Sequence, residues 1–209
     1  MCIRDSGYTD QTPVLLSLSR VAFEKNIHAL VEAMPDILEK EPAAQLLIVG
    51  EGPARPTLER QVREMGLQDH VSFTGQVDND QVCHYYQMAD VFVSASDSET
   101  QGLTYDEALA SDLPIVVMRS EYTDELIDDP AIGRSFQKRT DLVDGVLEYL
   151  ATPPSPEAIA KRREKLHDIS AEVFGQRVLD FYRVCQEEVA EKKRPGFGRR
   201  FLHLRNQND

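Results

Sequence analysis

The stretch Glu99-Thr-Gln-Gly-Leu-Thr-Tyr-Asp-Glu107 places two carboxylates on either side of a glycine turn. The apolar run before it, Asp90-Val-Phe-Val-Ser-Ala-Ser96, has the composition of a buried strand. The run after it, Ala108-Leu-Ala-Ser-Asp-Leu-Pro114, is typical of a helix and its stop. The first carboxylate therefore falls in a loop at the carboxyl end of a strand, and the second falls one turn into the next helix. In open α/β sheets, ligands bind at that edge.

The chemistry expected at this edge is that of a phosphate beside a diol. The backbone N–H groups of Gly102, Leu103 and Thr104 lie at the expected helix N-terminus, which favours anions. A carboxylate accepts two hydrogen bonds at once, so Glu99 and Glu107 suit the vicinal hydroxyls of a sugar or a ribose. Together these groups predict a nucleotide-sugar site. An acid-rich first turn that serves only capping and the helix dipole is the competing explanation.

The segment from Val14 to Leu38 predicts a second strand, loop and helix. One buried face of this helix is marked by apolar residues at helical spacing: Ile27, Leu30, Val31, Met34, Ile37 and Leu38. Arg20 and Lys25 are the cations of the loop, and they are suited to neutralise a diphosphate leaving group. Two solvated loop charges are the ordinary alternative.

Strands and helices alternate along the rest of the chain. The strands are expected near residues 13–19, 45–50, 70–74, 90–95, 114–118 and 132–136. The helices are expected near residues 26–40, 53–66, 79–89, 103–111, 122–128, 140–152, 156–167 and 169–191. Such alternation forms a parallel sheet with helices on both faces. The sequence therefore predicts an α/β fold with a doubly wound parallel sheet.

Four segments in this order resemble the donor-binding half of a family 4 glycosyltransferase, a family that has the GT-B fold. They are Leu-Ser-Arg-x4-Lys-Asn at 18–26, Leu47-Ile-Val-Gly-Glu-Gly-Pro53, Val71-Ser-Phe-Thr-Gly-Gln-Val77 and the Glu-x7-Glu pair at 99–107. The resemblance covers roughly residues 13 to 185. The version Thr-Gln-Gly-Leu-Thr-Tyr-x-Glu-Ala at 100–108 is similar to members that glycosylate diacylglycerol or related bacterial envelope acceptors.

The resemblance implies a role for each matching side chain. Arg20 and Lys25 would hold the donor diphosphate and Glu99 would contact hydroxyls of the donor sugar, so these three form the expected catalytic set. Glu107 would contact the ribose. Asp112 stands where family members usually carry glycine, at a position that looks like the residue after a helix and needs a positive φ.

The backbone around the expected site has implied roles as well. The amides of residues 102–104 would meet phosphate, and Val77 would lie beside the nucleobase. Gly50 and Gly52 would let backbone come close to the site. The family transfers sugar with retention of configuration and binds no metal in this half. The resemblance therefore implies transfer of a hexose from a UDP-sugar to a lipid or envelope glycan acceptor, with the UDP-sugar as co-substrate and with no cofactor or metal.

Two other functions remain open. The first is a catalytically silent nucleotide-binding or interaction module, favoured for these residues alone because they show no acceptor-side group. The second is a GT-B-type sugar-nucleotide epimerase, which would need histidine and acidic residues placed across the cleft, and the sequence offers no such set.

Two local motifs favour ordinary explanations. Gly50-Glu-Gly52-Pro-Ala-Arg55 begins like a dinucleotide fingerprint, but Arg55 stands where the third glycine should be, which argues against a nicotinamide cofactor. Asp78-Asn-Asp80 resembles a metal-binding pair, but Asp78 with Gln81 fits a helix capping box better.

Composition excludes several classes of protein. The chain has 209 residues and a formal net charge of −13, so nucleic acid is not an expected partner. Cys2, Cys83 and Cys185 have no metal or redox spacing, and an odd, scattered set suits a reducing compartment. No apolar run approaches the roughly 18 residues of a membrane span. The expected location is cytoplasmic.

The two ends differ from the body, so three parts are expected: a leader at 1–9, a nucleotide-sugar-binding domain at 10–190 and a basic tail at 191–209. The leader precedes the first strand abruptly, and the resemblance implies an acceptor domain on its N-terminal side that is missing here. The tail carries six Lys or Arg against two carboxylates, so it is +4 while the remainder is −17. Aromatic and leucine residues between these cations predict peripheral contact with the inner face of an anionic membrane. A disordered or domain-packing tail is the alternative.

Overall fold

The computed structural model describes residues 11–98 and 102–192. The chain divides into two compact units, Met1–Leu166 and His167–Asp209. The larger unit holds the sheet, and the described part of the smaller one contains the long helix α8 (Ala171–Lys192).

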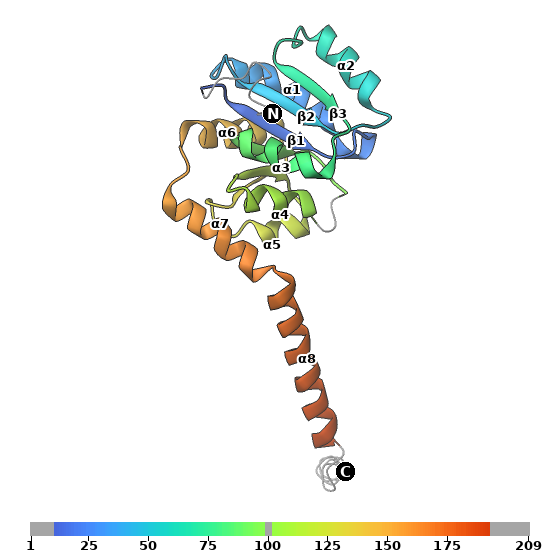
Figure 1. Ribbon diagram of the computed structural model, residues 1–209, viewed down its shortest axis with the longest axis vertical. Coiled ribbons are helices and arrows are strands. Elements are labelled where there is room, and N and C mark those ends of the chain that lie inside the picture. The colour runs from blue at the N-terminus through green and yellow to red at the C-terminus, as the bar shows by residue number, and fades with distance from the viewer. Residues whose placement is uncertain (1–10, 99–101, 193–209) are drawn as a thin grey trace, which may run out of the picture. The chain divides into compact units, whose positions relative to one another are not determined.

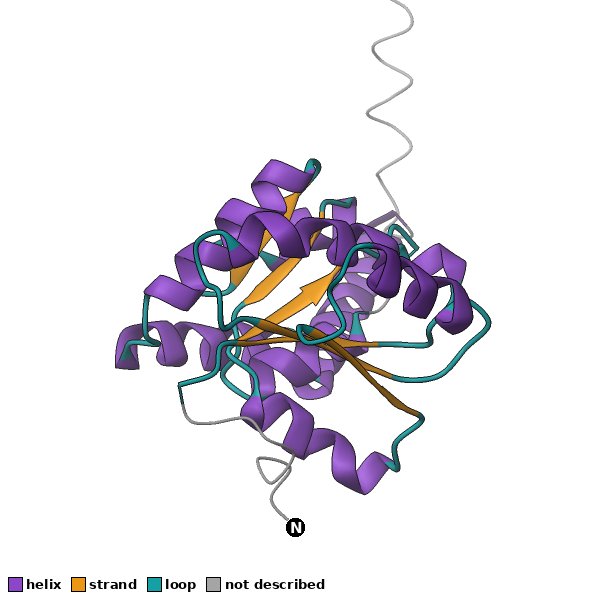
Figure 2. Ribbon diagram, turned by 90° about the horizontal axis from the view of Figure 1, so that it is seen from above, coloured by secondary structure: helices purple, strands orange, loops and turns teal. Residues whose placement is uncertain are grey.

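The sheet has six parallel strands, ordered β3-β2-β1-β4-β5-β6 (Figure 1). Their bounds are β1 Val14–Leu18, β2 Gln45–Val49, β3 Val71–Gly75, β4 Val91–Ser94, β5 Ile115–Met118 and β6 Gly133–Phe136. Figure 2 shows helices on both faces of this sheet. The predicted doubly wound α/β fold is confirmed, and each strand begins and ends within one residue of its expected range.

The helices follow the strands in alternation. They are α1 Ile27–Leu38, α2 Arg55–Glu64, α3 Asn79–Met88, α4 Leu103–Ala110, α5 Glu121–Leu126, α6 Arg139–Ala151 and α7 Pro156–Asp168, with a short 3-10 turn, η2, at Phe23–Lys25. Every α-helix bound, α8 included, lies within two residues of the expected one. The expected start of α7 is confirmed too, since Ser155 Oγ accepts a hydrogen bond from the Ala158 N–H at 3.1 Å.

Two apolar clusters fill the two sides of the sheet. Leu15 belongs to the cluster under α1, α2 and α6, while Leu16 belongs to the cluster under α3, α4 and α5. Successive side chains of a strand point to opposite faces, so a strand covered on both sides must be apolar throughout. Val14, Leu15 and Leu16 of β1 are each no more than 2% exposed. This double burial explains why the central strands read as continuous apolar runs.

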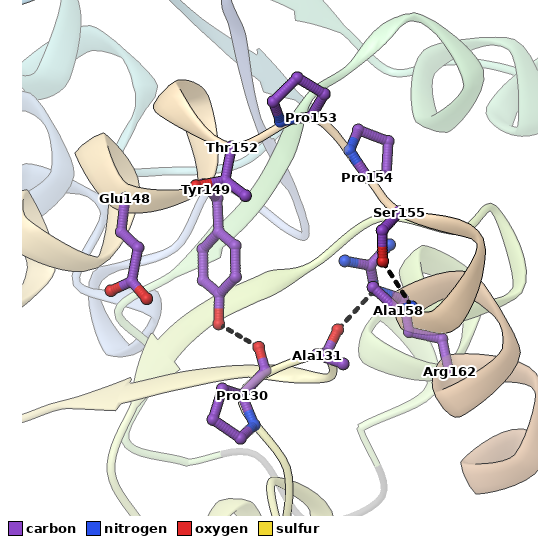
Figure 3. A pocket seen from close by; sticks show the side chains of 10 residues that line it. All are labelled: Pro130, Ala131, Glu148, Tyr149, Thr152, Pro153, Pro154, Ser155, Ala158 and Arg162. Carbon is purple, nitrogen blue, oxygen red and sulfur yellow. Dashed lines mark hydrogen bonds between the residues drawn. The ribbon is translucent and has the colours of Figure 1, made fainter.

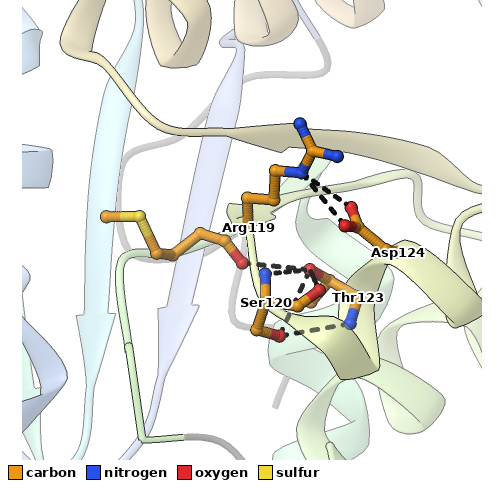
Figure 4. Close-up of polar contacts among 5 residues, drawn as sticks. Arg119, Ser120, Thr123 and Asp124 are labelled. Atoms are coloured by element: carbon orange, nitrogen blue, oxygen red, sulfur yellow. Dashed lines mark hydrogen bonds and ion pairs between the residues drawn. The ribbon is translucent and has the colours of Figure 1, made fainter.

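Helix α5 begins at a capping box that fixes its entry angle (Figure 4). The Thr123 N–H donates to Ser120 Oγ at 3.2 Å, and the Ser120 N–H donates to Thr123 Oγ1 at 2.8 Å. The Arg119 guanidinium contacts both carboxylate oxygens of Asp124 at 3.0 Å. These contacts hold the first turn of α5, which carries Tyr122 toward the start of α4.

Two local expectations about helix ends had different outcomes. Asp112 has a φ of 61°, which confirms the left-handed conformation expected after α4. Asp78 occupies the position before α3, but its side chain makes no capping hydrogen bond, so the capping box expected for Asp78 and Gln81 is wrong. The sequence therefore predicts the position of Asp78 before α3 correctly. Whether its side chain forms the capping hydrogen bond depends on the side-chain rotamer.

Within residues 11–98 and 102–192, no helix is long and apolar enough to span a bilayer. In the same ranges, no group of three or more His, Cys, Asp or Glu side chains could hold a metal ion.

Candidate functional site

The strand order reverses between β1 and β4. From β1, the chain builds outward to β2 and β3 on one side, and then returns to build β4, β5 and β6 on the other. The helices that follow β1 and β4, α1 and α4, lie on opposite faces of the sheet, and ligands of open α/β sheets bind at such a switch point. Most of the candidate residues from the first subsection lie in or after the loops that follow β1 and β4, whereas Gly50 and Gly52 follow β2 and Val77 follows β3.

The loop after β1 brings one cation to the end of β4. Lys25 ends the η2 turn, is half-buried, and its Nζ donates to Ser96 Oγ at 3.4 Å. Arg20 is exposed and forms an ion pair with Glu24 one turn later. Glu99, the third member of the expected catalytic set, lies outside the described residues. The structure thus brings Lys25 to Ser96, two residues after β4, whereas the ion-pair partner of Arg20 among the described residues is Glu24.

Gly50 and Gly52 allow two loops to pack backbone against backbone. Gly50 has a φ of +134°, and a Cβ there would lie 2.0 Å from the Ser19 carbonyl oxygen. A Cβ on Gly52 would lie 2.3 Å from the carbonyl oxygen of Val21. The two loops are also joined by a hydrogen bond from the Val21 N–H to the Glu51 carbonyl, at 3.0 Å. These glycines therefore position the cation-bearing loop; their approach to a bound donor stays a prediction.

Helix α4 begins after β4, on one side of this switch point, as expected. Gly102 is its N-cap residue, with a φ of 60°, and a Cβ there would lie 2.4 Å from the ring of Tyr122. Leu103 is 63% exposed and Thr104 is half-buried, so the first turn of α4 borders solvent. The first amides of a helix have no intrahelical acceptor and carry the positive end of its dipole. The arrangement suits a phosphate group.

Glu107 has a buried partner that the sequence did not reveal. The Tyr86 hydroxyl donates to Glu107 Oε2 at 2.8 Å and lies 3.2 Å from the Thr104 carbonyl oxygen. Tyr86 is 2% exposed, and burial, followed by the hydrogen bond to Glu107, raises the pKa of its phenol far above the usual range. Helical periodicity in residues 79–88 places Tyr86 on an inner face, but nothing in the sequence pairs it with a residue of α4.

Asp106 adds a second unusual carboxyl next to Glu107. Its Oδ1 atom is buried and has no hydrogen-bond partner among the described residues. Burial, and then the nearby charge of Glu107, raises the pKa of Asp106 from its ordinary value of 3.8 to about 6. A carboxylate in this position is costly for the folded state.

We expect Asp106→Asn to stabilise the protein at neutral pH. A carboxyl whose pKa rises on folding binds more protons in the folded state, so its cost appears as pH rises from about 4 to about 6 and persists above. The melting temperature of Asp106→Asn should exceed that of wild type at pH 7.5, and the difference should shrink at pH 4.5. Glu32→Gln, an exposed change on α1, controls for loss of one charge. A gain of equal size at both pH values would contradict this assignment.

The loop expected beside the nucleobase joins the same edge of the sheet. The Gly50 N–H donates to the Gly75 carbonyl at 3.0 Å, which links the ends of β2 and β3, and Val77 packs partly buried on the second cluster. Arg55, the residue that breaks the dinucleotide fingerprint, pairs with Glu51 at 2.6 Å and also with a glutamate one turn along α2. Its guanidinium fills space beside Gly75.

A separate cavity of about 230 Å³ lies at the opposite edge of the sheet (Figure 3). Tyr149, Arg162 and three prolines contribute to its wall. Arg162 is 2% exposed; its Nε donates to the Ala131 carbonyl at 2.7 Å and its Nη1 donates to the Asp112 carbonyl. Those carbonyls lie just before β6 and β5, so the guanidinium provides hydrogen-bond donors for backbone carbonyls at the amino ends of two strands. This cavity contains none of the expected site residues.

Residues 3–166 of the chain match the family described as Glycosyl transferases group 1. The match covers well over half of the chain, and the chain belongs to this family. Its doubly wound sheet is the Rossmann-like half of a GT-B glycosyltransferase.

Two curated relatives share one name. The chain is 44% identical over 177 residues to the alpha-monoglucosyldiacylglycerol synthase of Streptococcus pneumoniae, with 84% of this chain and 40% of that protein covered. It is 36% identical over 158 residues to the alpha-monoglucosyldiacylglycerol synthase of Acholeplasma laidlawii, with 76% and 40% covered. The chain thus resembles bacterial diacylglycerol glucosyltransferases, and the alignments span 40% of their length.

Solved structures share the fold. Sucrose-phosphate synthase from Thermosynechococcus elongatus superposes with a TM-score of 0.71 at 27% identity, covering 88% of this chain and 48% of that one. The pneumococcal O-GlcNAc transferase GtfA, solved in complex with UDP and GlcNAc, superposes with a TM-score of 0.67 at 22% identity, covering 87% and 37%.

Proposed function

We propose that this chain is the donor-binding half of a retaining glycosyltransferase that moves a hexose from a UDP-sugar to a lipid or envelope glycan acceptor. One observation carries the proposal: the loops after β1 and β4 meet at the switch point of the sheet. Lys25 lies against Ser96 there, and α4 opens there with Glu107 on its second turn. A cation, a helix N-terminus and a carboxylate match the diphosphate and ribose of a nucleotide sugar.

In this proposal the chain stabilises the departing diphosphate. Negative charge grows on the distal phosphate as its bond to the anomeric carbon breaks. Lys25, Arg20 and the first amides of α4 are cationic or dipolar groups that would offset this charge without a metal ion. Glu107 would hold the ribose hydroxyls, and Glu99 would hold hydroxyls of the sugar. Fixed charges of this kind act before the reaction begins, so they need no reorganisation during it.

The names of the relatives support the choice of donor and acceptor. Two relatives are named for a monoglucosyldiacylglycerol product, and one structural neighbour was solved with UDP. The same proposal places acceptor binding in sequence beyond these 209 residues, because those relatives are much longer. Peripheral contact of the basic tail, residues 191–209, with the inner face of an anionic membrane remains a prediction from its charge.

We expect Glu107→Ala to weaken UDP binding about ten- to a hundredfold, since a hydrogen bond to a charged group contributes roughly 1.5–3 kcal/mol. The variant should still fold, because the Tyr86 hydroxyl keeps the Thr104 carbonyl within reach at 3.2 Å. Isothermal titration calorimetry with UDP measures the effect, and Glu32→Gln is the control. Unchanged UDP affinity in Glu107→Ala would remove the ribose role. Failure of wild type itself to bind UDP would favour the silent interaction module.

A further inference from the structure

The hydrogen bond between Tyr86 and Glu107 joins two different helices across the edge of the site. Tyr86 comes from α3, which follows β3, while Glu107 comes from α4, which follows β4. The two residues are 21 positions apart, so the contact depends on the packing of α3 and α4.

Tyr86 is a rigid anchor. It belongs to the apolar cluster beneath α3, α4 and α5, and its ring lies 5.9 Å from the ring of Phe92 on β4, tilted by 31°. A ring packed in a protein core keeps a single orientation on average. Its hydroxyl therefore occupies one place, with one proton to donate. The Glu107 oxygen, at 2.8 Å, is closer than the Thr104 carbonyl, at 3.2 Å, so the carboxylate is the main acceptor.

Glu107, in contrast, is an exposed residue with a flexible side chain. Ordering a free glutamate side chain costs up to about 1.5–2 kcal/mol of rotamer entropy, which a ligand must offset when it binds. Because the Tyr86 hydroxyl already donates a hydrogen bond to Glu107 Oε2, part of this entropy cost is removed before a ligand binds. An ionised carboxylate has about four acceptor positions, so one hydrogen bond from Tyr86 leaves enough capacity for two ligand hydroxyls.

We propose that Tyr86 is a positioning residue that orients the Glu107 carboxylate toward the vicinal hydroxyls of the nucleotide ribose. The inference rests on the proposed function, since it assigns the ligand of Glu107 to a ribose. The competing explanation is that the Tyr86 hydroxyl merely finds an acceptor for its own buried proton. The two explanations predict different effects of removing the Tyr86 hydroxyl. Only the positioning role predicts a loss of affinity that depends on the ribose hydroxyls of the ligand.

The test compares UDP with 2′,3′-dideoxyuridine diphosphate, which lacks both ribose hydroxyls. Wild type should prefer UDP about ten- to a hundredfold, the effect expected for hydrogen bonds to a charged group. In Tyr86→Phe this preference should fall about three- to tenfold, with affinity for the dideoxy compound unchanged. If Tyr86→Phe weakened the binding of both ligands equally, the preference would be unchanged and the proposal would be overturned. Unchanged affinity for both ligands would overturn it as well.

Tyr105→Phe is the matched control. Tyr105 is also fully buried, its ring lies 5.8 Å from the ring of Phe92, and its hydroxyl donates to Ser94 Oγ at 3.3 Å. Loss of this hydroxyl should leave the preference for UDP unchanged. If both tyrosine variants lowered the preference for UDP equally, a general change in core packing would explain the effect, and the proposal would fail.

A double-mutant cycle separates this inference from the proposed function. In the Glu107→Ala background, Tyr86→Phe should have no further effect on UDP affinity, because the group that it positions is gone. Additive losses in the cycle would overturn the positioning role even if Tyr86→Phe alone is poorly stable. No effect of Glu107→Ala would instead contradict the ribose site itself.

Discussion

Replacing Arg162 by methionine should lower the free energy of unfolding by about 2–6 kcal/mol. The guanidinium satisfies two half-buried backbone carbonyls, at Ala131 and Asp112, and each of these acceptors would cost up to about 1–3 kcal/mol if left without a donor. Methionine keeps much of the side-chain volume, so the decrease in the free energy of unfolding reflects the lost hydrogen bonds more than a new cavity. Urea denaturation followed by circular dichroism measures the change.

The next residue supplies a matched control for this experiment. Arg163 has the same charge on the same helix, but its side chain is 68% exposed and pairs with the Asp112 carboxylate at 2.9 Å. Exposed ion pairs typically contribute 0–1 kcal/mol, roughly, so Arg163→Met should be nearly neutral. Equal losses in the two variants would mean that the carbonyl contacts of Arg162 contribute little.

Gly52→Ala should reduce both stability and UDP affinity. The added Cβ would meet the Val21 carbonyl oxygen at 2.3 Å. Because that oxygen is backbone and a Cβ cannot rotate away from its own backbone, one of the two loops must move. Overpacking of this kind costs about 1–3 kcal/mol. The displaced loop carries Arg20 and Lys25, so we expect UDP binding to weaken at least about tenfold, the value of one charged contact.

Gly66→Ala separates these two effects. Gly66 lies after α2 with a φ of +70°, and a Cβ there would contact nothing within 4 Å. Alanine at this φ costs about 1–2 kcal/mol, yet the loop after β1 stays in place. Calorimetry should therefore show normal UDP affinity in Gly66→Ala. If that variant bound UDP as poorly as Gly52→Ala, general destabilisation would explain both results.

The fold was predictable because its signals are local. Strands buried on both faces give short apolar runs such as Ile115–Met118, and amphipathic helices such as Ile27–Leu38 give a regular apolar stripe. Once strands and helices alternate, a parallel sheet follows, and so does a crevice at the carboxyl ends of its strands. The positions of Lys25 and Glu107 at that edge therefore follow from the sequence.

The contacts that shape the site were not predictable in the same way. Whether Tyr86 contacts Glu107, or whether a Cβ on Gly52 meets the Val21 carbonyl, depends on how elements far apart in the sequence pack. The unformed capping hydrogen bond of Asp78 shows the same limit at short range, since a rotamer decides it. A buried arginine such as Arg162 is rare, and no local pattern marks it.

The contacts of Arg162 also define where chimeric glycosyltransferases can be joined. Arg162 lies on α7, but its two acceptors precede β5 and β6, so α7 completes the sheet domain. A crossover placed in the proline-rich turn before Pro156 would combine a guanidinium from one parent with carbonyls from the other. A crossover after Leu166 keeps these partners together. The compact unit and the family match both end at that residue, which makes it the natural junction for exchanging the sheet domain.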